Sequence, residues 1–86
     1  MAALRLEGWF CFKVHGSETM MAGLPDIIVC ASGKFIGLET KNPGDELKTS
    51  VRQELVHQMI EAAGGAAFVV SSPADAVELV RGVLAS

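Results

Sequence analysis

The sequence predicts a small α/β fold, in which a mixed β-sheet is flanked by helices in the order α-β-β-β-α-β-α. Two short apolar runs, 27–30 and 35–38, flank a glycine-containing turn, as in a β-hairpin. Apolar residues recur at helical spacing across 51–63. Another apolar run, 66–70, follows this helix, and its position predicts a parallel crossover onto the hairpin.

The totals describe one small domain with enough apolar residues for a core. The chain has 86 residues, half of them hydrophobic, and a formal net charge of −3. That charge is not a nucleic-acid signature by itself and argues against tight metal-free DNA binding. No apolar run approaches about 20 residues, so we expect no membrane span, and the N-terminus lacks a signal-peptide pattern. Cys11 and Cys30 lie in apolar runs, and we expect buried free thiols, as in a reducing cytoplasm.

The first elements are a short helix and a strand. Residues 1–7 can form one or two helical turns before a glycine. Residues 9–14 are expected to form a strand, with Phe10 and Phe12 on one face and Trp9 on the other. We expect these aromatic side chains to pack in the core, with a dimer interface as the alternative for Trp9.

The hairpin brings two acids together. With Ser32-Gly33 as its two-residue loop, Asp26 lies opposite Glu39. Opposed side chains on antiparallel strands have Cβ atoms about 4.5–5.5 Å apart. Side chains alternate along a strand, so Lys41 projects on the same face as Glu39. Pro25 suits the first position of the strand and would hold Asp26 in place.

Two opposed carboxylates repel each other, and a divalent cation would remove that repulsion. Mg²⁺ is typically bound by one or two carboxylates together with water and phosphate oxygens. A lysine beside the metal can orient or deprotonate a water molecule, or neutralise charge on a phosphate. The pattern therefore favours a phosphodiester-cleaving site over a surface hairpin with unrelated charges.

The helix that follows begins beside this site. Thr49 or Ser50 can cap it, and with Ser50 as the cap Gln53 has the spacing of a capping box. Gln53 can also point to the sheet edge where the acids lie, and His57 is expected at the surface. The predicted apolar stripe consists of Val51, Leu55, Met59 and Ala63, widened by Val56 and Ile60. In the last helix Ser72 is the expected cap and Pro73 the first residue, with Ala76, Val77, Val80, Val83 and Leu84 buried.

Several motifs in order resemble the VRR-NUC family of PD-(D/E)XK nucleases, in the stand-alone form carried by phages and bacteria. They are Gly23-Leu24-Pro25-Asp26, Gly33-Lys34-Phe35, Glu39-Thr40-Lys41, Ser50, Gln53 and Ala63-Gly64-Gly65. The resemblance runs from about Gly8 to Leu84. It implies a restriction-endonuclease-like core that uses Mg²⁺ or Mn²⁺, with Asp26, Glu39, Lys41 and Gln53 in the catalytic site. It also implies a metal contact from the backbone carbonyl of Thr40, and a homodimer similar to Holliday-junction resolvases.

The first helix is shorter than the family's, which carries an acidic residue. Glu7 could take that position, Glu18 fits it less well, and Glu7 as a solvated charge is the simpler interpretation. Lysine, arginine, histidine and serine near the predicted site are candidates for phosphate contacts. These candidates are Lys13, His15, Ser17, Lys48 and Arg52.

We expect a metal-dependent endonuclease that hydrolyses DNA phosphodiester bonds and recognises the shape of branched or duplex DNA rather than its sequence. Two protomers would supply two cuts. The alternative is a non-catalytic module of the same fold, a DNA-structure binder or an assembly subunit, favoured by the short first helix and the acidic net charge. A small regulatory or toxin-like protein has no positive feature beyond size. The expected location is the cytoplasm of a bacterium or of a phage-infected host cell.

Overall fold

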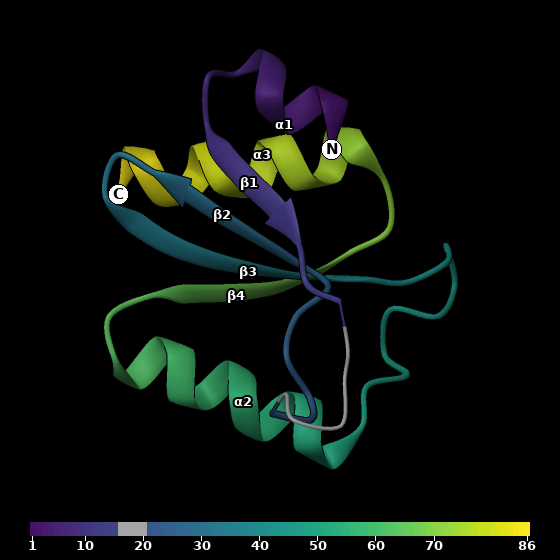
Figure 1. Cartoon of the computed structure of the whole chain (residues 1–86). Coiled ribbons are helices and arrows are strands. Elements are labelled where there is room, and N and C mark those ends of the chain that lie inside the picture. The colour runs from purple at the N-terminus through teal and green to yellow at the C-terminus, as the bar shows by residue number, and fades with distance from the viewer. Residues whose placement is uncertain (16–20) are drawn as a thin grey trace.

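Four strands form one mixed sheet, and helices cover both of its faces (Figure 1). The structure is a computed structural model that describes residues 1–15 and 21–86. Its elements are α1 (Ala2–Leu6), β1 (Phe10–Lys13), β2 (Ile27–Ala31), β3 (Lys34–Thr40), α2 (Val51–Ala62), β4 (Ala66–Val70) and α3 (Pro73–Ala85). The sheet order is β1-β2-β3-β4, with β4 parallel to β3 and the other pairs antiparallel. The predicted element order and mixed sheet are confirmed, and none of the described helices is long and apolar enough to cross a membrane.

The hairpin has the predicted register. Ser32 and Gly33 both adopt positive φ, 50° and 76°, which matches the twist of a two-residue hairpin loop. Ala31 pairs with Lys34, and the pairing continues to Ile27 opposite Leu38. One step further places Asp26 opposite Glu39, as the turn predicts.

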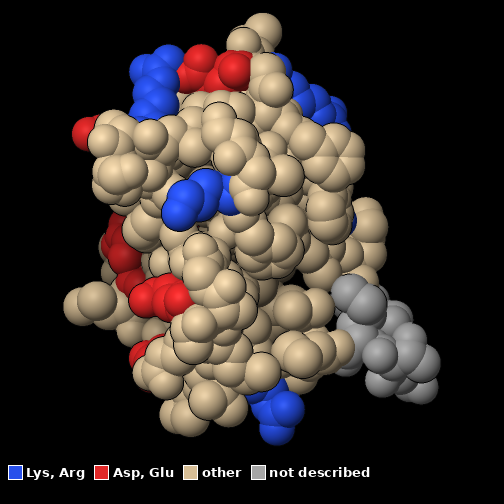
Figure 2. Space-filling model, turned by 90° about the vertical axis from the view of Figure 1, so that its left-hand side faces the viewer, with Lys and Arg blue, Asp and Glu red and all other residues tan. Residues whose placement is uncertain are grey.

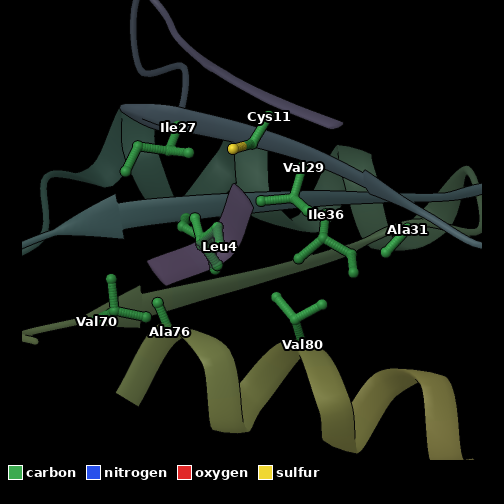
Figure 3. Packing of buried hydrophobic residues seen from close by; sticks show 10 residues of the cluster. Leu4, Cys11, Ile27, Val29, Ala31, Ile36, Val70, Ala76 and Val80 are labelled. Atoms are coloured by element: carbon green, nitrogen blue, oxygen red, sulfur yellow. The ribbon is translucent and has the colours of Figure 1, made fainter. Parts of the chain in front are cut away.

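The core lies between the sheet and the pair α1 and α3. Leu4, Val29, Ile36 and Val80 are almost fully buried, and Figure 3 shows their side chains directed into the space between sheet and helix. The start of α3 is confirmed, because the Ser72 side chain accepts a hydrogen bond from the Asp75 N–H and Pro73 takes the first turn. Of the predicted α3 stripe, Ala76 and Val80 are buried, and Val77, Val83 and Leu84 pack partly buried against the core.

On the other face, α2 lies against β4 and the adjoining part of β3. A Cβ on Gly37 of β3 would stand 2.6 Å from Pro25 Cγ and 3.4 Å from Ile60 Cδ1, so this glycine allows close packing. Val56 is buried and Ile60 half-buried. The prediction that the other residues of the α2 stripe face the sheet is wrong, because the helix turns their side chains to solvent. Val51, Leu55 and Met59 are exposed, as is Ala63, and His57 is half-buried rather than a surface residue.

Among the residues that the structure describes, no helix lies over the β1 end of the α2 face. Phe10 is 68 % exposed and Phe12 is 44 % exposed, so the expectation that they pack in the core is wrong. Cys30 is also exposed and faces the same side, since it pairs with Phe10 and Phe35, so its predicted burial is wrong. Trp9 packs on the opposite side against the core, and Cys11 is buried there; both thiols are free.

Candidate metal centre and its surroundings

The predicted acids meet at one end of the sheet. Asp26 directly precedes β2, and Glu39 lies one residue before the end of β3. The backbone of Asp26 is fixed from both sides, because its carbonyl accepts a hydrogen bond from the Val14 N–H (2.8 Å) and the preceding Pro25 is buried.

Thr40 holds the Asp26 carboxylate. Asp26 Oδ2 accepts hydrogen bonds from the Thr40 N–H (2.8 Å) and from the Thr40 hydroxyl (2.7 Å). Burial by itself would raise the pKa of Asp26, but these two hydrogen bonds, the contact with Glu39 and the charge of Lys41 lower it below its usual value. Asp26 is therefore ionised over the physiological range.

Glu39 is the one buried acidic or basic residue among those described, with 3 % of its surface exposed. Its Oε1 accepts a hydrogen bond from Gln53 Nε2 (2.9 Å) and lies 4.0 Å from Lys41 Nζ. Its Oε2 is buried and has no hydrogen-bond partner among the residues that the structure describes. Burial and the neighbouring Asp26 charge raise the pKa of Glu39 to about 7, against the opposing effect of Lys41. The pair therefore lacks a positive charge at Oε2, which a cation or a proton would supply.

Gln53 joins the helix cap to the site. The Gln53 side-chain Oε1 accepts a hydrogen bond from the Ser50 backbone N–H (2.9 Å). The Gln53 backbone N–H donates to Ser50 Oγ (3.1 Å), which completes the predicted capping box. The same Oε1 lies 3.5 Å from Lys41 Nζ, while the amide nitrogen donates to Glu39. Both predicted roles of Gln53 are therefore found, and the cap fixes which way its amide points.

This donor set fits a magnesium ion. The Asp26 and Glu39 carboxylates and the Thr40 carbonyl would leave room for the water and phosphate oxygens that Mg²⁺ retains. A cation would give Glu39 Oε2 the partner that it lacks among the described residues. Within the described ranges, no group of three or more acidic, histidine or cysteine side chains could hold a metal. Glu7 does not join the pair, since its carboxylate pairs with Arg81 of α3. Glu18 lies outside the described residues.

The predicted DNA contacts fall into separate places. Lys13 and His15 line a cavity together with Asp26. Lys48 lines a shallower hollow beside Lys41, and its amine pairs with Asp45 at 3.0 Å. Arg52 is exposed at the start of α2, beside Gly23. Ser17 lies outside the described residues.

The side chain of Thr40 is the contact that the sequence analysis missed. Only its backbone carbonyl was expected at the metal, yet its hydroxyl and amide fix Asp26. Alternation places the Thr40 side chain on the face opposite that of Glu39, so the register alone did not predict this contact with Asp26, which lies just before β2 at the end of the sheet.

Comparisons of this chain with protein-family models, with curated proteins and with solved structures find no match.

Proposed function

We propose that this chain is a metal-dependent endodeoxyribonuclease of the VRR-NUC type, with a restriction-endonuclease-like PD-(D/E)XK core. The observation that carries the proposal is the buried, unpartnered Glu39 Oε2 next to the ionised Asp26, with an amine 4.0 Å from the other Glu39 oxygen. A buried carboxylate oxygen that lacks a hydrogen bond destabilises a fold when the group is ionised. Near neutral pH a bound cation would replace the proton that the raised pKa of Glu39 retains, and would stabilise the ionised pair.

Asp26, Glu39 and the Thr40 carbonyl would hold Mg²⁺ or Mn²⁺, which when bound polarises the scissile phosphate and lowers the pKa of water. Thr40 keeps Asp26 in place, and Gln53 does the same for Glu39. Both acids are thus positioned before substrate arrives, so little reorganisation is needed.

Lys41 orients or deprotonates the attacking water. The water oxygen forms a bond to phosphorus, one phosphorus–ester oxygen bond breaks, and the leaving oxygen ends with a proton. Among the described residues, the Lys41 amine makes no close ion pair: its nearest acceptors are Gln53 Oε1 at 3.5 Å and Glu39 Oε1 at 4.0 Å. It is therefore available to a water or to a phosphate oxygen.

DNA is the proposed substrate, in duplex or branched form. No helix or ribbon of the described residues projects beyond the domain as a groove reader (Figure 1), which supports recognition of shape rather than of base sequence. The two free thiols support a reducing compartment, such as the cytoplasm of a bacterium or of a phage-infected host.

A homodimer is the proposed assembly. Phe10, Phe12 and Phe35 form an exposed apolar row on the α2 face of the sheet, and Leu55 and Met59 of α2 are also exposed. The row carries no charge, so a second copy can face it about a two-fold axis without opposing like charges. The end of the molecule seen in Figure 2 is mostly uncharged, with basic side chains near its centre and at its lower edge, acidic side chains on the left, and both kinds along the top.

Nicking of supercoiled plasmid tests the activity. Wild type is expected to nick with Mg²⁺ or Mn²⁺ and not with chelator, and Asp26→Ala or Lys41→Ala should lower the rate by at least about 100-fold. The matched control is Lys34→Ala, which changes an exposed lysine at the far end of the hairpin. Equal nicking by wild type and both site variants would mean contamination and would overturn the assignment.

A non-catalytic DNA-structure binder or assembly subunit of the same fold is the second candidate. The net charge of −3 and a Glu7 engaged with Arg81 instead of the metal pair favour it. Such a module would bind Mn²⁺ or DNA without nicking, so a protein that binds Mn²⁺ in calorimetric titration, loses that binding in Asp26→Ala and yet does not nick plasmid would support the module over the nuclease.

A further inference from the structure

A cavity of about 580 Å³ opens beside the metal pair, on the α1 and α3 side of the sheet. Asp26, Thr40 and Lys41 form the wall that it shares with the site. The remaining wall comes from the end of β1, from α1 and from the start of α3. The cavity therefore borders Asp26 and Lys41, two of the residues to which the proposed function assigns the chemistry.

Its lining is divided by chemistry. Leu4 and Ala76, both buried, belong to an apolar floor between α1 and α3. Lys13 and His15 stand at the rim, at the end of β1, and Ser71 follows β4 on the other side. An apolar floor with a lysine and a histidine on one rim suits a ligand that has a flat apolar part and an anionic part.

We infer that this cavity binds one unpaired nucleotide of the DNA strand, next to the scissile phosphate. The base would pack on the floor between α1 and α3, and its phosphate would meet Lys13 and His15. Pockets of roughly 300–1,000 Å³ accept ligands of this size. A base within a duplex is stacked and paired, so it enters such a pocket only after leaving the stack.

This inference rests on the proposed nuclease function and gives it a substrate preference. DNA with a bulged, flapped or branch-point nucleotide already has an unstacked base and avoids the unstacking cost. Wild type should therefore bind a duplex with one unpaired nucleotide about tenfold more tightly than the fully paired duplex.

The test is equilibrium binding of these two fluorescent duplexes, in Ca²⁺, to wild type and to two neighbouring variants of α1. Ala3 lines the cavity, whereas Ala2 is exposed and does not. Ala3→Phe should fill the cavity and abolish the preference for the unpaired nucleotide, and Ala2→Phe should retain it. Circular dichroism and the melting temperature check that both variants fold.

A second pair of variants tests the rim. Lys13→Ala should weaken binding of both duplexes. The slope of log affinity against log salt concentration should become smaller in magnitude by about 1. Lys34→Ala should change neither, since Lys34 is exposed at the turn, away from the cavity.

The outcomes separate the two proposals. A preference that survives in Ala3→Phe, or that wild type lacks, overturns the nucleotide pocket even if plasmid nicking depends on Asp26. A preference that Ala3→Phe abolishes supports the pocket even if no nicking occurs, and in that case only the nuclease assignment fails. Tighter binding of single-stranded RNA than of the bulged DNA would overturn the DNA assignment of the pocket.

Discussion

Glu39 makes the metal-free protein sensitive to pH. Its pKa in the folded state is raised from 4.5 to about 7, first by burial and then by Asp26. Between those two values the folded chain holds a proton that the unfolded chain has released, so stability falls as pH rises. The shift of Asp26 has the opposite sign and acts at lower pH, where protonation of Asp26 removes its stabilising hydrogen bonds with Thr40.

We predict that metal-free protein loses stability between pH 5.5 and pH 8.5, by an amount on the order of 1–3 kcal/mol. Urea unfolding in the presence of chelator at the two pH values measures the loss. Added Mn²⁺ should restore stability at pH 8.5 and have little effect at pH 5.5, because the cation and the proton compete for the same carboxylate. Equal metal-free stability at both pH values would contradict the pKa assigned to Glu39.

A companion prediction concerns Glu39→Gln. The amide keeps an oxygen that accepts the Gln53 hydrogen bond and removes the charge, so metal-free stability at pH 8.5 should rise by about 1–2 kcal/mol. Mn²⁺ binding and nicking should be lost together. The matched control is Glu61→Gln, which changes an exposed acid on α2 and should leave stability and metal binding within about 0.5 kcal/mol of wild type.

At the scale of elements, the hairpin was predictable because its register depends on two adjacent residues. The Ser32-Gly33 turn fixes every pair out to Asp26 and Glu39, so the positions of both acids follow from the turn. The inward face of α2 was not predictable in the same way. Leu55 and Met59 extend the apolar stripe of the sequence but face solvent, because α2 approaches the sheet through Val56 and Ile60. Periodicity shows that a helix has an apolar side and does not show which edge of that side meets the sheet.

Gly37 of β3 lies against Ile60 of α2 and against Pro25, the residue before Asp26. In Gly37→Ala the new methyl would stand 2.6 Å from Pro25 Cγ, so Pro25 and the adjacent Asp26 must shift. We predict a loss of about 1–3 kcal/mol in stability and weaker Mn²⁺ binding. Chemical denaturation and calorimetry measure the two effects.

Gly82→Ala is the control for that substitution. Its added methyl meets nothing within 4 Å in α3, so it should stabilise the protein by about 0.5–1 kcal/mol through helix propensity. Gly37→Ala behaving like Gly82→Ala would show that the contact between Pro25 and β3 does not position Asp26.

At the scale of the molecule, two helices cover one face of the sheet and one helix covers part of the other. That difference explains why Phe10 and Phe12 are exposed, although the sequence predicts them in the core. Their alternation with Trp9 and Cys11 indicates two apolar faces, and a sequence with two apolar faces predicts a sheet buried on both sides. In the part of the chain that the structure describes, no helix covers the apolar face over β1 and β2, and this is the face that the proposed homodimer would bury. A domain of this size gains particular benefit from such burial.

We therefore predict that Phe10→Lys converts a dimer into a monomer while leaving the fold intact. Phe10 is already 68 % exposed in the single chain, so its replacement removes little intrachain packing, but two lysines would be desolvated in the interface. Light scattering coupled to gel filtration should give twice the 9.1 kDa chain mass for wild type and one chain mass for Phe10→Lys. Leu6→Lys is the matched control, since Leu6 is 87 % exposed on α1, on the opposite face of the sheet. This variant should remain dimeric. A monomeric wild type would overturn the proposed dimer. A dimer that Leu6→Lys disrupts and Phe10→Lys does not would place the interface elsewhere. Either result would leave the exposure of the three phenylalanines unexplained.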